Sequence, residues 1–403
     1  MCIQLKSKWY QDLKNCTKLK DLAEGSKIHA YLLRMRVLEH DSNAGVALLN
    51  FYAKCGAHSK AQVVFDMLDV QTIASWNTLI SGYTRNGCGQ EAIACFRQVQ
   101  QEGIFPDVVT FMSILKACCF LKTLTLGKEI HAEIIKDGLL QKDSVLGNCL
   151  VDMYARCGAL AKAQEVFNQL TVRDVVSWTA LVVGYAEHGL GNEALKCFKQ
   201  MQDAGIRPNS VTYASVLKAC GILGSLEMGE AVATEIRKQD LFRRDVMLGN
   251  TLVDMYAKCG ALNKACEVFE ELPVRGVVSW NIVISGYTQN GLGAEAVKCF
   301  RQMQESKVIP NAITYISILK ACGMTGSLAV GEKIDAEVRK QGLVFKDITL
   351  GNSLVAMYVK CGALEKAQQV HEKLQVRNVV SWNVLIAGYS QHGQGHGAMN
   401  CVA

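Results

Sequence analysis

Residues 175–209 read VVSWTALVVGYAEHGLGNEALKCFKQMQDAGIRPN and predict two helices joined by a short turn. A break at Gly189 and Gly191 separates two stretches in which apolar residues recur at helical spacing. Gly205 and Pro208 end the second stretch. The two apolar stripes are Trp178, Leu181, Val182 and Tyr185, and then Ala194, Cys197, Phe198 and Met201. The segment is therefore predicted to be a helix–turn–helix.

The opening phrase of this segment recurs along the chain. Its tryptophans stand 102 residues apart, at Trp76, Trp178, Trp280 and Trp382. They open the phrases SWNTLISGYTRNG, SWTALVVGYAEHG, SWNIVISGYTQNG and SWNVLIAGYSQHG. A fixed period of this kind is typical of tandem arrays whose repeats bury their faces against one another. Because each Trp leads an apolar stripe and a Tyr follows seven residues later, we interpret the Trp as a packing residue.

Each 102-residue unit divides into three hairpins with different phrases, of 36, 31 and 35 residues. The 31-residue phrase recurs as NFYAKCGAHSKAQVVFDML, DMYARCGALAKAQEVFNQL, DMYAKCGALNKACEVFEEL and AMYVKCGALEKAQQVHEKL. The predicted fold is all-α, a solenoid of helix–turn–helix repeats that forms a single array over residues 6–403.

The composition is typical of helices buried on one side and indicates little about function. Half of the 403 residues are apolar, only 4 are proline, and the formal charge of +6 permits an anionic partner without requiring one. No apolar run reaches the ~18 residues that a membrane helix needs. Of the 17 cysteines, 12 follow the 102-residue period, and no CxxC pair occurs. We interpret them as packing thiols in a reducing compartment.

The alternation of lengths, with the SWN…GY, LKAC and YAKCGAL phrases in this order, resembles the pentatricopeptide repeat (PPR) proteins of plants, and within them the PLS subclass. The resemblance implies a right-handed superhelix whose first helices line a concave groove. The L motifs are 6–41, 108–143, 210–245 and 312–347; the S motifs are 42–72, 144–174, 246–276 and 348–378; the P motifs are 73–107, 175–209, 277–311 and the partial 379–403. The chain shows neither the C-terminal extension motifs nor the DYW deaminase domain of many such proteins.

In that family the array binds single-stranded RNA, about one base per repeat. The fifth residue of a motif contacts the base edge and the last residue assists. Asn77 follows Trp76, so it lies about 100° from the buried stripe and is expected to face the ligand. The implied base-reading pairs are Asn77 with Asp107 and Asn148 with Asp174 for uracil, Thr179 with Asn209 for adenine, and Asn281 with Asn311 and Asn352 with Asn378 for pyrimidines, cytosine somewhat preferred.

Some motifs depart from this pattern. Asn250 is paired with Gly276, which leaves its base open, and Val46 with Thr72 is expected to read nothing. The L motifs are treated as spacers, because their fifth residues are Tyr10, Met112, Ala214 and Ile316. The alternative for each Asn is a solvated residue near a helix start.

Two further sets carry implied roles. The second residues Val176 and Val278 are expected to sandwich bases, with a core position as the alternative. Cations at the thirteenth place of the S motifs are expected to contact RNA phosphates: Lys54, Arg156, Lys258 and Lys360. Lysines at the ninth place of the L motifs lie on the same predicted face: Lys14, Lys116, Lys218 and Lys320.

The sequence offers no catalytic constellation. The triplet from His131 to Glu133 matches the HxE of zinc deaminases, but no PCxxC follows. We therefore expect no enzyme activity, no cofactor and no metal, and interpret the triplet as a chance match within a helix.

The expected function is sequence-specific RNA binding in organellar C-to-U editing, with a cytidine deaminase or other editing protein acting in trans and no membrane contact. The resemblance places the protein in the mitochondrion or chloroplast, although no transit peptide is visible. Two alternatives stay open: a protein-binding scaffold like tetratricopeptide repeats, and an inactive fragment of a longer editing factor.

Overall fold

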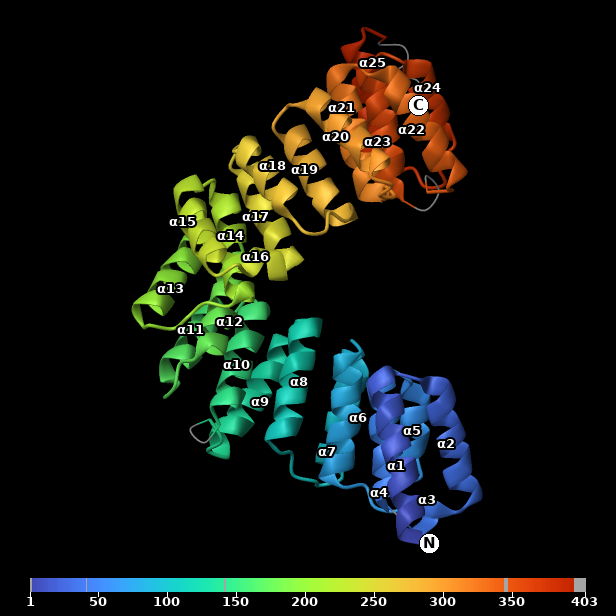
Figure 1. Ribbon diagram of the computed structural model, residues 1–403, viewed down its shortest axis with the longest axis vertical. Helices are drawn as coiled ribbons and strands as arrows, with labels where there is room; N and C mark the ends of the chain where they lie inside the picture. Colours follow the sequence, from blue (N-terminus) through green and yellow to red (C-terminus); the bar gives the residue numbers. More distant parts are fainter. Residues whose placement is uncertain (1, 41, 141–142, 344–346, 395–403) are drawn as a thin grey trace. The chain divides into compact units, whose positions relative to one another are not determined.

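The computed structural model describes residues 2–40, 42–140, 143–343 and 347–394, and regular structure in these ranges is helical throughout (Figure 1). The predicted fold class, an all-α solenoid of helix–turn–helix repeats, is confirmed. Two compact units divide the chain, one formed by residues 1–188 and 196–207 and the other by 189–195 and 208–403.

The first unit contains α1 (Cys2–Leu19), α2 (Leu22–Arg34), α3 (Val37–His40), α4 (Ser42–Cys55), α5 (His58–Asp66), α6 (Ile73–Arg85), α7 (Gly89–Gln101), α8 (Val108–Leu121), α9 (Leu124–Lys136), α10 (Ser144–Arg156), α11 (Leu160–Gln169) and α12 (Val175–Glu187). The boundary between the two ranges runs through α13 (Gly191–Asp203).

The second unit contains α14 (Ser210–Leu223), α15 (Leu226–Lys238), α16 (Leu241–Arg244), α17 (Val246–Lys258), α18 (Leu262–Glu271), α19 (Val277–Gln289), α20 (Gly293–Glu305), α21 (Ala312–Thr325), α22 (Leu328–Lys340), α23 (Ile348–Lys360), α24 (Leu364–Glu372) and α25 (Val379–Gln391).

The first helices of successive hairpins pack against one another within each unit. In the first unit, α4, α6, α8, α10 and α12 form such a row, and in the second α14, α17, α19, α21, α23 and α25 do so. Each row places equivalent helix positions beside one another, which is the geometry that a repeated site requires.

Three of the repeated tryptophans, Trp76, Trp178 and Trp280, are core residues, as the apolar stripes predict, and Trp382 is half-buried. Trp76 is 1% exposed and its ring lies 4.4 Å from that of Phe65, edge to face. Trp178 and Phe167 repeat this contact at 4.6 Å, between α12 and α11. Each Trp therefore joins one hairpin to the second helix of the hairpin before it, and its indole ring faces the core.

The cysteines from Cys16 to Cys361 are all free thiols. Cys118 is fully buried, and Cys157 donates a long hydrogen bond from Sγ to its carbonyl oxygen at 3.7 Å. Burial raises the pKa of the equivalent thiols Cys220 and Cys322 to about 12. The periodic thiols serve as small packing groups between first helices.

In the ranges that the structure describes, no helix combines the length and the apolar character needed to cross a bilayer.

Candidate nucleic-acid interface

The predicted base-reading residues occupy one equivalent position on successive first helices. They lie on α6, α10, α12, α17, α19 and α23 as Asn77, Asn148, Thr179, Asn250, Asn281 and Asn352. All six come at the fifth residue of their motif, about one turn into the helix, beside the loop that enters the next hairpin.

Asn77 is joined directly to the last residue of its motif. Its amide Nδ2 donates to both carboxylate oxygens of Asp107, at 2.9 and 3.0 Å. A carboxylate only accepts, so the amide must turn its nitrogen towards Asp107 and its oxygen Oδ1 away. Oδ1 accepts a hydrogen bond from Oγ1 of Thr110 at 2.6 Å.

Asp107 has a second role at this joint, the boundary between the hairpin 73–107 and the hairpin 108–143. It is the N-cap of α8, and its Oδ1 accepts from the backbone N–H of Thr110 at 2.9 Å. A capping carboxylate satisfies backbone donors that a helix start would otherwise leave unpaired. The last residue of the motif is thus held rigidly by the helix that follows it.

Asn148 makes the same contact at the next joint. Its Nδ2 lies 3.1 Å from both carboxylate oxygens of Asp174. Asp174 caps α12 by accepting from the backbone N–H groups of Val176 and Ser177, at 2.9 and 3.0 Å.

The second unit repeats the pairing with amides in place of carboxylates. Asn281 donates to Oδ1 of Asn311 at 3.0 Å, and Asn352 donates to Oδ1 of Asn378 at 3.3 Å. Asn250 has no such partner, since the last residue of its motif is Gly276.

Thr179 and Asn209 are held locally. Thr179 donates from Oγ1 to the carbonyl of Val175 at 2.6 Å, one turn earlier in α12. Asn209 caps α14 and accepts from the backbone N–H of Thr212 at 2.9 Å.

The base-reading side chains are more deeply placed than their helical position suggests. Asn77 is 8% exposed and Asn148 only 4%. The alternative of a solvated residue near a helix start is therefore wrong for Asn77 and Asn148. The physical reason is the cap residue of the next helix, which holds the amide between the hairpins. Asp107 itself is exposed, so the pair meets solvent through its carboxylate.

The predicted sandwiching residues are on the surface. Val176 is 54% and Val278 57% exposed, which rules out the alternative of core positions. The same second position is exposed in other motifs, where the sequence analysis assigned nothing: Val109, Val145, Val211, Met247, Ile313 and Val380. Counting second positions in L and S motifs as well as P motifs would have found this apolar row.

The partial motif also holds a residue that the sequence analysis missed. Asn383 of α25 is the fifth residue of 379–403 and is exposed. Its place in the register of Asn77 and Asn281 was sufficient to find it.

The predicted phosphate-binding cations end their helices but differ in their neighbours. Arg156 pairs with Asp152 at 2.8 Å and Lys258 with Asp254 at 2.6 Å. The positions equivalent to these aspartates hold Asn50 before Lys54 and Ala356 before Lys360. The lysines at the ninth place of the L motifs, Lys14, Lys116, Lys218 and Lys320, are exposed.

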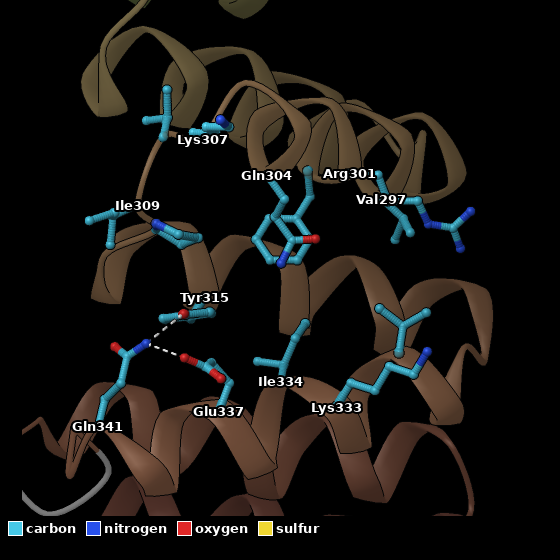
Figure 2. Close-up of a pocket in the computed structure, with 14 residues that line it drawn as sticks. Val297, Arg301, Gln304, Lys307, Ile309, Tyr315, Lys333, Ile334, Glu337 and Gln341 are labelled. Carbon is cyan, nitrogen blue, oxygen red and sulfur yellow. Dashed lines mark hydrogen bonds between the residues drawn. The ribbon is translucent and has the colours of Figure 1, made fainter.

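A cavity of about 610 Å³ lies elsewhere, between α20, α21 and α22 (Figure 2). Gln341 donates within it to the Tyr315 hydroxyl at 3.3 Å and to Glu337 at 2.6 Å. Its walls include Arg301 and Lys333, and none of the predicted base-reading residues lines it.

His131, the histidine of the HxE triplet, is a buried residue that packs between helices. Its Nδ1 lies 2.9 Å from the Tyr154 hydroxyl, and the side chain is 5% exposed. Glu133 accepts from Gln100 at 3.0 Å. Among the described residues no group of three or more His, Cys, Asp or Glu is arranged to hold a metal ion.

Comparisons with known proteins identify the repeats. The model described as "PPR repeat family" matches residues 71–119, 173–221 and 275–324, and that described as "PPR repeat" matches 148–175, 250–277, 352–379 and 380–402. Together they cover more than half of the chain.

Curated relatives in Arabidopsis thaliana are pentatricopeptide repeat proteins as well. A mitochondrial pentatricopeptide repeat-containing protein is 36% identical over 388 residues, which are 96% of this chain and 56% of the relative. A chloroplastic one is 34% identical over 383 residues, 94% of this chain and 61% of the relative. The chain spans little more than half the length of these two relatives.

Solved structures share the fold. The pentatricopeptide repeat protein PPR10, in complex with an 18-nt psaJ RNA element, has a TM-score of 0.75 at 19% identity, covering 96% of this chain and 58% of PPR10. A second structure of PPR10, from maize, has a TM-score of 0.66 at 19% identity, covering 98% of this chain and 62% of PPR10. With its tandem hairpins, matching repeat models and plant relatives, the chain belongs to the pentatricopeptide repeat family.

Proposed function

We propose that this chain binds single-stranded RNA in a sequence-specific manner and serves as a specificity factor for C-to-U editing of an organellar transcript, with catalysis supplied by another protein. The observation that carries the proposal is the recurring contact between the fifth and last side chains of a motif, at Asn77 with Asp107 and at Asn148 with Asp174. An amide can donate to and accept from a base edge, and a carboxylate can accept from one.

The surface around these pairs suits an unpaired RNA strand. The exposed apolar row, to which Val176 and Val278 belong, offers packing surfaces for base faces. The exposed lysines and the cations that end the S-motif helices supply positive charge for phosphates. The low exposure of Asn77 means that a base meets the exposed Asp107 first and reaches the amide by a small opening of the joint.

The relatives guide the remaining parts of the proposal. PPR10 was solved with RNA, and the Arabidopsis relatives carry mitochondrial and chloroplastic names. The alternation of 36-, 31- and 35-residue motifs supports membership of the PLS subclass. We place the protein in a mitochondrion or chloroplast, and we assign the deamination step to a partner in trans.

The pairs predict an order of bases. With RNA running 5′ to 3′ along the chain from N to C, and L motifs as spacers, residues 73–378 correspond to 5′-UNUANNYNY-3′, where Y is a pyrimidine. Asn250 with Gly276 contributes one of the unspecified positions.

The test is fluorescence anisotropy with the 403-residue chain and the labelled forward RNA 5′-UAUAAACAC-3′, compared with the RNA 5′-AAACAAAAA-3′, which is mismatched at every specified nucleotide, and with a DNA version of the forward sequence. Selective binding of the forward RNA supports the proposal. Equal or absent binding of all three contradicts it and favours a protein-binding scaffold. An editing assay with a cytidine deaminase added in trans then separates an active specificity factor from an inactive fragment.

A further inference from the structure

The joints between hairpins hold the base-reading amide in two different ways. Where a P motif is followed by an L motif, both the nitrogen and the oxygen of the amide form hydrogen bonds. Nδ2 of Asn77 donates to Asp107, and Oδ1 accepts from Thr110 at 2.6 Å. In the second unit, Oδ1 of Asn281 accepts from Thr314 at the same distance of 2.6 Å.

Where an S motif meets a P motif, only the nitrogen is engaged. Nδ2 of Asn148 donates to Asp174, while its Oδ1 is buried and has no hydrogen-bond partner among the described residues. The oxygens of Asn250 and Asn352 are in the same condition in the described part of the second unit. An unsatisfied buried carbonyl oxygen at three equivalent places needs a physical account.

The difference arises from the third residue of the following motif. L motifs carry Thr110 or Thr314 there, with the hydroxyl directed at the preceding amide. P motifs carry serine, and Ser177 turns its hydroxyl back to the carbonyl of Asp174 at 3.0 Å. Ser381 does the same with its own cap residue at 2.8 Å.

The two arrangements differ in how freely the amide can rotate. The last torsion of an Asn side chain has a broad, roughly two-fold profile, so an unrestrained amide can present either its N–H or its C=O. Uracil and cytosine differ by an exchange of donor and acceptor on the same edge, because uracil has N3–H and O4 where cytosine has N3 and N4–H₂. The carboxylate of Asp174 still orients the amide nitrogen of Asn148, but an amide held at one end turns more readily than an amide held at both ends. The amide held at both ends should therefore match one of the two bases better.

We propose that Thr110 and Thr314 are positioning residues that fix the base-reading amide of the preceding P motif. Asn77 and Asn281 then discriminate between uracil and cytosine more sharply than Asn148 and Asn352 do. This inference rests on the proposed RNA-binding function.

The first unit offers a matched comparison. Asn77 with Asp107 and Asn148 with Asp174 are the same amide–carboxylate pair, so their joints differ chiefly in Thr110 against Ser177. Binding of the 403-residue chain is measured with 5′-UAUAAACAC-3′ and with versions in which the first or the third nucleotide is cytosine. The readout is the ratio of the two Kd values at each nucleotide.

Thr110→Val should lower the uracil preference at the first nucleotide roughly threefold to tenfold, the range expected for one hydrogen bond. The preference at the third nucleotide should stay unchanged. Thr110→Ser, which keeps the hydroxyl, should remain within about twofold of the unmodified chain.

A control separates this role from capping. Ser177 also accepts from the backbone N–H of its cap residue Asp174, at 3.0 Å, but its hydroxyl makes no hydrogen bond to Oδ1 of Asn148. Ser177→Ala therefore removes a comparable cap interaction and should leave the preference at the third nucleotide unchanged.

The outcomes are distinct. If the unmodified chain does not bind these RNAs or shows no base preference, the proposed function fails. If it prefers uracil and Thr110→Val weakens binding to all RNAs with an unchanged ratio, the threonine is only a cap residue and the inference is overturned. Should Thr110→Val fail to fold by circular dichroism, Thr314→Val is tested in the same way at the seventh nucleotide.

Discussion

Gly82 of α6 lies directly against Ala53 of α4, so closely that a Cβ atom on Gly82 would stand 2.6 Å from the Cβ of Ala53 and 3.2 Å from its Cα. Gly184 approaches Ala155 in the same way at the next joint of this kind in the unit, again at 2.6 Å. These contacts let the first helices of an S motif and the following P motif pack at short range, which holds the adjacent base-reading positions at a constant spacing.

Gly82→Ala should destabilise the first unit, because the added methyl group meets the backbone of α4 and cannot be relieved by rotating a side chain. We expect a loss of about 1–3 kcal/mol in the free energy of unfolding, measured by urea denaturation. Gly276→Ser is the control, since nothing lies within 4 Å of a Cβ there and its φ is −82°. It should change the value by less than about 0.5 kcal/mol. Equal losses for the two variants would contradict the close-packing explanation.

Gly276→Asp should create a base-reading pair. The position is the N-cap of α19, has extended backbone geometry and lacks a side-chain cap. A carboxylate there can accept from the backbone as Asp174 does, and can receive the amide of Asn250. The variant should gain a preference for uracil at the sixth nucleotide of the proposed RNA, measured by anisotropy with each of the four bases at that place. Gly276→Ser is the control. If it gave the same uracil preference at the sixth nucleotide as Gly276→Asp, the pairing of the carboxylate with Asn250 would be contradicted.

Removing Lys360 should weaken RNA binding more than removing Arg156. Arg156 is partly neutralised by Asp152, whereas Ala356 stands at the equivalent place before Lys360. Lys360→Ala should reduce the slope of log K against log salt by about 0.7, the value for one phosphate contact on a single strand. Asp152→Asn should strengthen binding at low salt. An unchanged slope for Lys360→Ala would remove this lysine from the interface.

Lowering the pH should destabilise the fold through His131. Burial lowers the pKa of this histidine, with the charge of Lys162 adding to the effect. The unfolded chain then binds the proton more readily than the folded chain, so stability is complete above the ordinary histidine pKa of about 6.5 and is lost as the pH falls below it.

Thermal unfolding at pH 7.5 and 5.5 checks this expectation. The fall in Tm on acidification should be smaller for His131→Gln than for the unmodified chain. Some of the fall should remain, because burial also lowers the pKa of His29 and His371. A fall of the same size in His131→Gln would assign the acid sensitivity to other groups.

Periodicity was sufficient to predict the helices and the core. The stripe led by Trp178 marks the buried face of α12, and the glycines after it mark the turn. The buried face and the turn repeat with the period of the chain, so the sequence alone exposes them. The pairing of Asn77 with Asp107, which a whole hairpin separates, was expected instead from the resemblance to the pentatricopeptide repeat family.

The depth of the site could not be predicted in this way. The place of Asn77 on its helix indicates a direction from the helix axis, but its exposure depends on Asp107 and Thr110, which come from the next hairpin. The pairing of Arg156 with Asp152 follows from the rotamers of both side chains, which a repeat pattern does not encode. A contact between hairpins decides the first feature, and side-chain conformation within α10 decides the second.

The contact between Gly82 and Ala53 recurs between Gly286 and Ala257, at 2.8 Å. Because Gly184 and Ala155 supply the copy between these two, the same glycine–alanine contact recurs every 102 residues over three units. A segment of that length could be duplicated or deleted among these units with the first helices meeting a similar surface at the new junction. Recombination between the copies would then lengthen or shorten the proposed RNA site by three nucleotides at a time, without any new interface between helices having to evolve.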